Sequence, residues 1–325
     1  LANGLTYIGN KDQNGADIIK FTAFAPNTKS AALESKIMVD IQPVNDAPAI
    51  TAPGSYSTVE DSETILSGII LSDVDANELF GSVVQISVSV NHGTISPGNY
   101  AGIRMVSDGV YRGGIAELHQ AFKNLKYLPH ANWYGMDTVA FTLNDLGNHG
   151  LGTAKNTTQT IAVSVKSQND PPKITIPSNY YDVQEDTTLQ IDGVNVFDVD
   201  SNDGLYSFRV YARNGYINVD TNLSTVAISN ITIAIEDTSV SPLYGGSVAL
   251  QKVTAVDVIG PYFAVKAAIS KLYYTSHTNW NGIDAITFLI TDSGSSTEGK
   301  LSASADILVG VKPVNDPTVV KVKDS

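Results

Sequence analysis

Three copies of one short phrase constrain this chain more than any other feature. The copies are Val-Asn-Asp-Ala-Pro at 44–48, Asn-Asp-Pro-Pro at 169–172 and Val-Asn-Asp-Pro at 314–317. A second phrase, Gly-x-Asp-x-x-x-Phe, precedes each copy and starts at Gly15, Gly135 and Gly282, in steps of 120 and 147 residues. Self-similarity at a long period is the signature of a tandem array, in which each copy forms one structural unit. We therefore predict a series of similar domains.

The repeated phrases also predict the domain boundaries. We expect the C-terminal part of a repeat at 1–47, a full repeat at 48–171, a longer full repeat at 172–317 and the start of a next repeat at 318–325. The longer repeat gains about one hairpin, which we place within residues 219–260. Because the chain opens inside a repeat without a leading Met or signal peptide, we expect a fragment or processed piece of a longer protein.

Alternating apolar residues predict that each repeat is built from β-strands. Val84, Ile86 and Val88 alternate with polar residues, and Phe141 and Phe288 lie in similar runs. One apolar face at period two is typical of a strand packed on a core. Many short strands separated by turn residues indicate a β-sandwich. We predict an all-β fold of tandem sandwiches.

One short segment in each full repeat follows a helical period instead. Its apolar residues are Ile115, Leu118, Phe122 and Leu125 in one repeat, and Phe263, Val265, Ile269 and Leu272 in the other. Residues three and four apart share a face of a helix. Each full repeat is therefore expected to contain one short helix, just before a Leu-x-Tyr strand (Leu125 and Tyr127, or Leu272 and Tyr274).

Composition excludes several classes of partner. Only 16% of the residues are charged, yet the net charge is −13 and the pI is about 4.6. Nucleic acids and anionic membranes attract clusters of Lys and Arg, so neither is expected to bind here. The chain has no Cys, which excludes disulfides and thiolate sites. No apolar run approaches the ~20 residues of a membrane span. An acidic balance is compatible with divalent cations.

A longer motif resembles a known family. It runs Leu118-x-x-Ala121-Phe122-x-x-Leu125-x-Tyr127-x-Pro129-x-x-Asn132-Trp133-x-Gly135-x-Asp137, and continues at Asn144-Asp145-Leu146-Gly147-Asn148. This motif resembles the cadherin-like tandem repeats of large extracellular adhesins and surface proteins, and it is distantly similar to chondroitin-sulfate-proteoglycan repeats. The resemblance covers nearly the whole chain. It implies Ig-like or cadherin-like sandwiches in a linear array, placement outside the cell or at its surface, and a role in adhesion or as a spacer.

Oxygen-bearing side chains gather around each repeated phrase and suggest calcium. Calcium prefers six to eight oxygen ligands, mostly carboxylates and carbonyls. The candidate ligands at the first joint are Asn45, Asp46, Glu60, Asp61, Asp73 and Asp75. Those at the second joint are Asn169, Asp170, Glu185, Asp186, Asp198 and Asp200. The alternative is that Asn-Asp-Pro only forms turns and that the acidic residues are solvated.

The likeness to cadherins adds one acidic residue from the preceding unit to each site. Asp145 fits this place at the second joint, whereas the matching position at the first joint is Ala25. The first site is therefore expected to be weaker or built differently. The chain has no clear counterpart of the acidic Asp-Arg-Glu motif of cadherins, and the third phrase, at Asn315-Asp316, lacks the next unit.

Other conspicuous residues have simpler explanations. Asp137 and Asp284 are expected to close the turn into the next strand rather than to bind metal. Trp133 and Trp280 are expected to cover the core, although an exposed indole could stack on a sugar. The sequence also contains three possible glycosylation sites, which are Asn156, Asn222 and Asn230.

No motif indicates an enzyme. The five His residues form no His-x-x-x-His pair, and the nucleophile-elbow and phosphate-loop motifs are missing from the sequence. Our leading hypothesis is a calcium-stiffened extracellular rod, whose partners are its neighbouring repeats. One alternative is a glycosylated subunit that associates with other copies in an extracellular filament. A less favoured alternative is a module that binds carbohydrate or another cell-surface ligand.

Overall fold

The computed structural model describes most of the chain. The described residues are 4–23, 33–76, 82–147, 150–201, 204–219, 254–295 and 299–318, together with the main chain of 232–235. The chain divides into two compact units, Leu1–Ser167 and Gln168–Ser325, which are treated separately below. The predicted boundaries of the individual repeats remain predictions.

The first unit begins with a hairpin that matches the predicted end of a repeat. Strands β1 (Gly15–Ala23) and β2 (Leu33–Ile41) pair antiparallel, with Gly15 opposite Ile41. The same hairpin recurs twice further along, with Gly135 opposite Val165 and Gly282 opposite Val311. The repeated glycine phrase therefore marks the start of one conserved type of strand pair.

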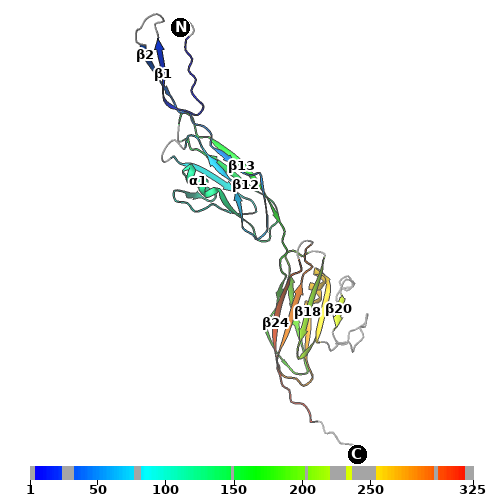
Figure 1. Cartoon of the computed structure of the whole chain (residues 1–325). Coiled ribbons are helices and arrows are strands. Elements are labelled where there is room, and N and C mark those ends of the chain that lie inside the picture. Colours follow the sequence, from blue (N-terminus) through cyan, green and yellow to red (C-terminus); the bar gives the residue numbers. More distant parts are fainter. Residues whose placement is uncertain are drawn as a thin grey trace, which may run out of the picture. The chain divides into compact units, whose positions relative to one another are not determined.

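The remainder of the first unit is a β-sandwich (Figure 1), which we call the first sandwich. Its larger sheet contains, in spatial order, β4 (Ser55–Val59), β13 (Asn156–Lys166), β12 (Gly135–Asn144), β7 (Val84–Ser89), β10 (Val110–Gly113) and β9 (Arg104–Ser107). Its smaller sheet contains β5 (Thr64–Ser67), β11 (Asn124–Pro129) and β8 (Gly93–Ser96). A short pair joins β3 (Ala49–Thr51) to β6 (Ile70–Ser72).

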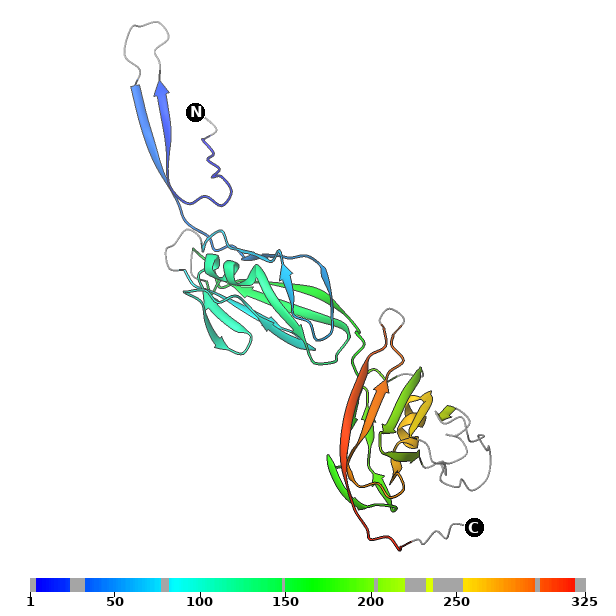
Figure 2. The ribbon, with the colours of Figure 1, turned by 60° about the horizontal axis from the view of Figure 1, so that its bottom comes forward.

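The second unit repeats this plan as the second sandwich (Figures 1 and 2). Its larger sheet contains, in spatial order, β15 (Tyr180–Gln184), β24 (Ser302–Lys312), β23 (Gly282–Thr291), β18 (Leu205–Ala212), β21 (Ala255–Pro261) and β20 (Thr232–Ile235). Its smaller sheet contains β16 (Thr188–Asp192), β22 (Lys271–Ser276) and β19 (Gly215–Val219). The short pair is β14 (Lys173–Thr175) with β17 (Asn195–Phe197). The all-β prediction is confirmed, whereas most of the predicted extra hairpin lies outside the described residues.

Each sandwich also contains the predicted short helix. Helix α1 spans Ile115–Phe122 and α3 spans Tyr262–Ala268. Leu125 and Leu272 are buried on the strands that follow the helices, as expected. One detail was wrong, because Phe263, which the helical pattern counted among its apolar residues, is exposed.

The two cores are built from equivalent residues. In the first sandwich Phe122, Tyr127 and Phe141 are buried between the sheets, and in the second Tyr274 and Phe288 take equivalent places. Inward-facing residues of both sheets interdigitate in such a core, which holds the strand ends in a defined arrangement. The ends of the strands are where the candidate ligands lie.

Candidate cation site

One end of each sandwich collects acidic side chains from three places in the sequence. In the first sandwich Asn45 and Asp46 precede β3, Asp73 and Asp75 follow β6, and Asp145 follows β12. The start of β3 lies beside the end of β6 because these strands are antiparallel, with Ala49 opposite Ser72. We call these five side chains the first cluster.

Hydrogen bonds join the members of the first cluster. The Asn45 side-chain amide donates to Asp145 Oδ2 at 2.8 Å, and the Asp46 main-chain N–H donates to Asp75 Oδ2. Asp73 Oδ1 accepts the N–H of Asp75 at 3.0 Å. Asp145 Oδ1 accepts the N–H of Lys155 at 2.8 Å. The segment before the sandwich is thus tied to the sandwich itself.

The second cluster reproduces these bonds with Asn169, Asp170, Asp198, Asp200 and Asp292. The Asn169 amide donates to Asp292 Oδ2 at 2.9 Å, and the Asp170 N–H donates to Asp200 Oδ2 at 2.7 Å. The Asp200 N–H donates to Asp198 Oδ1 at 2.9 Å. Asp292 Oδ1 accepts the N–H of Leu301 at 2.9 Å. The same arrangement occurs twice, at positions more than 100 residues apart in the sequence. It is therefore a property of the repeated fold and not of one sandwich alone.

Burial makes the negative charge of both clusters costly. Asp145 and Asp292 are 3% and 2% exposed, and Asp73 and Asp198 are 3% and 4% exposed. Loss of solvent raises the pKa of Asp73 and of Asp198 above the ordinary value, and the neighbouring carboxylates raise it further. Main-chain N–H donors oppose this shift only in part. A cation bound at these oxygens would favour the ionised form.

The two clusters differ in the groups that surround them. In the first, the Lys155 ammonium donates to the main-chain carbonyl of Asn45. The equivalent residue in the second is Leu301, because Asp145 N–H bonds to Lys155 O and Asp292 N–H bonds to Leu301 O. In the second cluster the Tyr206 hydroxyl donates to Asp198 Oδ2 at 2.9 Å. Burial, followed by this bond, raises the pKa of Tyr206.

The structure changes the predicted assignment of one ligand. Asp145 was assigned to the joint at Asn169, but it bonds to Asn45 and belongs to the first cluster. The acidic residue that bonds to Asn169 is Asp292, which the sequence analysis missed. A signal was present, because Asp145 and Asp292 each lie ten residues after the glycine of the repeated phrase. Ala25, the proposed gap, lies outside the described residues.

Other predicted ligands lie at the opposite end of the sandwich. The Glu60 N–H bonds to the carbonyl of Lys166 at the far end of β13, while Asp145 lies beside the start of that strand. The eleven residues of β13 span roughly 35 Å at the usual rise per residue. Glu60 therefore does not join Asn45. Glu185 lies likewise at the end of β24, where its Oε1 accepts the Val314 N–H at 2.6 Å.

Asp61 and Asp186 have a local role. Both residues adopt positive φ angles, 55° and 58°, and Asp61 Oδ1 accepts the Asn132 N–H at 3.0 Å. Asp186 Oδ1 accepts the Asn279 N–H at 3.1 Å in the same way. Asp side chains commonly fix turns of this kind.

Asp137 and Asp284 are structural, as predicted, but their hydrogen bonds reach beyond their own turns. Asp137 is buried and accepts the Tyr127 hydroxyl at 2.9 Å, and Asp284 accepts the Tyr274 hydroxyl at 3.0 Å. Trp133 and Trp280 are half-buried and pack against the cores. The ring of Trp133 also stacks on His92, with centroids 4.3 Å apart. One face of the Trp133 indole is therefore already covered by His92.

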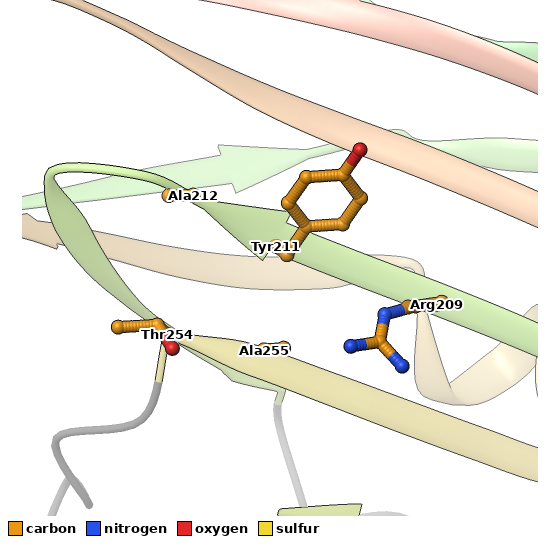
Figure 3. Close-up of a pocket in the computed structure, with 5 residues that line it drawn as sticks. All are labelled: Arg209, Tyr211, Ala212, Thr254 and Ala255. Carbon is orange, nitrogen blue, oxygen red and sulfur yellow. The ribbon is translucent and has the colours of Figure 1, made fainter. Parts of the chain in front are cut away.

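The remaining features offer little for chemistry. Across the described residues, no three His, Asp or Glu side chains already converge as metal ligands, so an ion at either cluster would have to draw the carboxylates closer together. In the same residues, no helix is long and apolar enough to cross a membrane. A small hollow on the second sandwich lies beside Arg209 and Tyr211 (Figure 3), but Arg209 is paired with Asp257 at 3.2 Å. Asn156 is exposed at the start of β13, whereas Asn222 and Asn230 lie outside the described residues.

Comparisons with known proteins bear on the fold alone. No family model and no curated protein matches the chain. Among solved structures, mouse protocadherin-24 EC1-3 is 12% identical with a TM-score of 0.33, covering 93% of this chain and 81% of that one. Human desmocollin-1 (15%, TM-score 0.28) covers 91% of this chain, which spans about half, 48%, of that ectodomain. Human CDH23 EC21-23 is 14% identical, with a TM-score of 0.30 and coverages of 82% and 70%. These neighbours are cadherin ectodomain repeats, the class that the sequence motif resembles.

Proposed function

We propose that this chain is a segment of an extracellular structural or adhesive protein, and that its first and second clusters bind calcium. The observation that carries the proposal is the duplicated cluster, in which an Asn-Asp pair, an Asp-x-Asp pair and a buried Asp meet at the same end of both sandwiches. The resemblance of the sequence motif to cadherin-like repeats supports extracellular placement.

The ligand chemistry of the clusters suits calcium. Each cluster supplies carboxylate oxygens from four Asp residues and an amide oxygen from one Asn, and calcium takes six to eight such hard oxygens with main-chain carbonyls and water completing the set. The oxygens of Asp73 and Asp198 are kept from water, which is costly for their ionised forms. A bound divalent cation would reverse that cost. The Lys155 ammonium already places a positive charge beside the first cluster.

Binding would have a mechanical consequence. Asn45 and Asp46 belong to the segment that precedes the first sandwich, and Asp73 and Asp145 belong to the sandwich itself. An ion held by both would fix that segment against the sandwich and remove part of its conformational freedom. Asn169 and Asp170 would be fixed in the same way to the second sandwich. Reduced freedom at these segments is what a protein that transmits force requires.

Calcium titration of the whole chain tests the proposal. We expect heat of binding in calorimetry and a higher thermal unfolding temperature with calcium, because ligand that binds only the folded state stabilises it. Asp73→Asn and Asp198→Asn should each remove one class of sites, since Asn retains the local hydrogen bonds without the charge. Asp108→Asn, an exposed residue between β9 and β10, is the control. Wild-type protein that neither binds calcium nor gains stability would refute the proposal.

Self-association into a filament is a second candidate, and one observation favours it. The outer face of the second sandwich exposes Leu205, Ile259 and Leu289 on three adjacent strands. The first sandwich has Arg112 and Thr142 at the places of Ile259 and Leu289. Light scattering at increasing concentration should show assembly that Leu289→Thr weakens. A monomer at all concentrations would exclude this role for the face.

A further inference from the structure

The residue that ends the loop of each cluster carries a charge in one sandwich and none in the other. Lys155 follows the loop after β12, and Leu301 follows the loop after β23. Their main-chain atoms are used identically, since each N–H donates to the buried Asp and each carbonyl accepts the N–H of that Asp. The difference between the two positions is therefore confined to the side chains.

The Lys155 side chain places its positive charge at the first cluster. Its ammonium donates to the main-chain carbonyl of Asn45, a residue that is 1% exposed and whose side chain donates to Asp145. Leu301 has no charge, and its side chain is 37% exposed. A carbonyl engaged by an ammonium is less available to a second cation, and an ion that approached the same carbonyl would be repelled by the ammonium.

We propose that Lys155 is an internal competitor of calcium, so that the first cluster binds calcium more weakly than the second. The inference rests on the proposed function, because it concerns the same two sites. Its consequence is ordered filling, in which the second cluster fills at a lower calcium concentration than the first. The segment before the first sandwich then becomes fixed only when calcium is abundant, which makes this lysine a determinant of the calcium range in which the protein stiffens.

Titrations of the whole chain can isolate each cluster. Asp198→Asn leaves the first cluster and Asp73→Asn leaves the second, and we expect calorimetry to show about tenfold weaker binding in the Asp198→Asn protein, a factor equal to about 1.4 kcal/mol. Adding Lys155→Leu to Asp198→Asn should remove that difference. Adding Leu301→Lys to Asp73→Asn should weaken calcium binding at the second cluster by a similar factor.

Two controls separate charge from packing. Lys126→Leu, added to Asp198→Asn, removes the same charge from β11, where Lys126 pairs with the exposed Glu63 at 2.8 Å, and should leave the calcium affinity unchanged. Lys155→Gln keeps a donor for the Asn45 carbonyl without the charge and should tighten binding as Lys155→Leu does. It also replaces Lys155→Leu if that variant fails to fold, as judged by circular dichroism.

The outcomes distinguish this inference from the proposed function. Two results would overturn the role of Lys155 while leaving calcium binding intact. One is an equal calcium affinity in the two Asp→Asn proteins, and the other is a calcium affinity that neither Lys155→Leu nor Lys155→Gln increases. Weaker binding after removal of the lysine charge would also overturn it. Absence of calcium binding in the wild-type chain would overturn both proposals.

Discussion

The first and second sandwiches carry their clusters on the same framework, yet they surround the buried charge differently. The first has Lys155 beside the Asn45 carbonyl and Val84 at the start of β7. The second has Leu301 and, at the place of Val84, Tyr206, whose hydroxyl bonds to Asp198. The comparison teaches that the main chain of the repeat positions the acidic residues, while a few side chains decide which charges and hydrogen-bond donors lie beside them.

The largest expected effect tests the shared part of this comparison, which is the core. Phe141→Ala and Phe288→Ala should each lower the free energy of unfolding of their own sandwich by about 3–5 kcal/mol, since both rings are fully buried. Denaturant unfolding followed by circular dichroism measures the change. Met136→Ala and Ile283→Ala, exposed on the same two strands, are matched controls. A large loss from only one of the two Phe variants would mean that the cores are not equivalent.

A smaller effect tests the tyrosine that distinguishes the second cluster. Tyr206→Phe removes the hydroxyl that donates to Asp198 and should cost about 1 kcal/mol of unfolding free energy in calcium-free protein. The unfolding of the first sandwich, which has Val84 at this place, should be unaffected. Tyr211→Phe, on the exposed face of the same strand, is the control. An equal loss from both Tyr variants would show that the bond to Asp198 contributes nothing.

The smallest effect, set by pH, should be common to both sandwiches. Burial raises the folded-state pKa of Asp73 and Asp198 above the unfolded value. Their stabilising contribution is therefore fully present below the unfolded pKa and is lost as pH rises through the folded pKa. In calcium-free protein, Asp73→Asn and Asp198→Asn should reduce this loss of stability between acid and neutral pH. Unfolding curves at several pH values measure it, and curves unchanged by both substitutions would contradict the shift.

Features that depend on local periodicity could be predicted from the sequence. Alternating apolar residues predicted the strands, and the glycine phrase marked the same hairpin three times. The structural roles of Asp137 and Trp133 were also predicted, whereas their contacts with the turn at Asn91 and His92 were not. The helix pattern was less reliable at Phe263, which is exposed although its spacing fits the apolar face.

The composition of the clusters could not be predicted in the same way. Glu60 and Asp73 are close in sequence but lie at opposite ends of the sandwich, because β4 pairs parallel with β13 and carries Glu60 to the far end. Asn45 and Asp145 are 100 residues apart but share a hydrogen bond. Sequence proximity therefore joined residues that the sheet separates, and the likeness to cadherins assigned Asp145 to the wrong cluster.

By itself, the sequence determined that this protein is a tandem array of all-β repeats, each with a short helix and with acidic residues near the repeated phrase. Only the tertiary structure decided that Asp145 and Asp292 complete the clusters and that Lys155 and Leu301 occupy equivalent places beside them. The physical reason is that strand alternation is dictated by neighbouring residues, whereas the meeting of strand ends depends on non-local pairing within a packed sandwich.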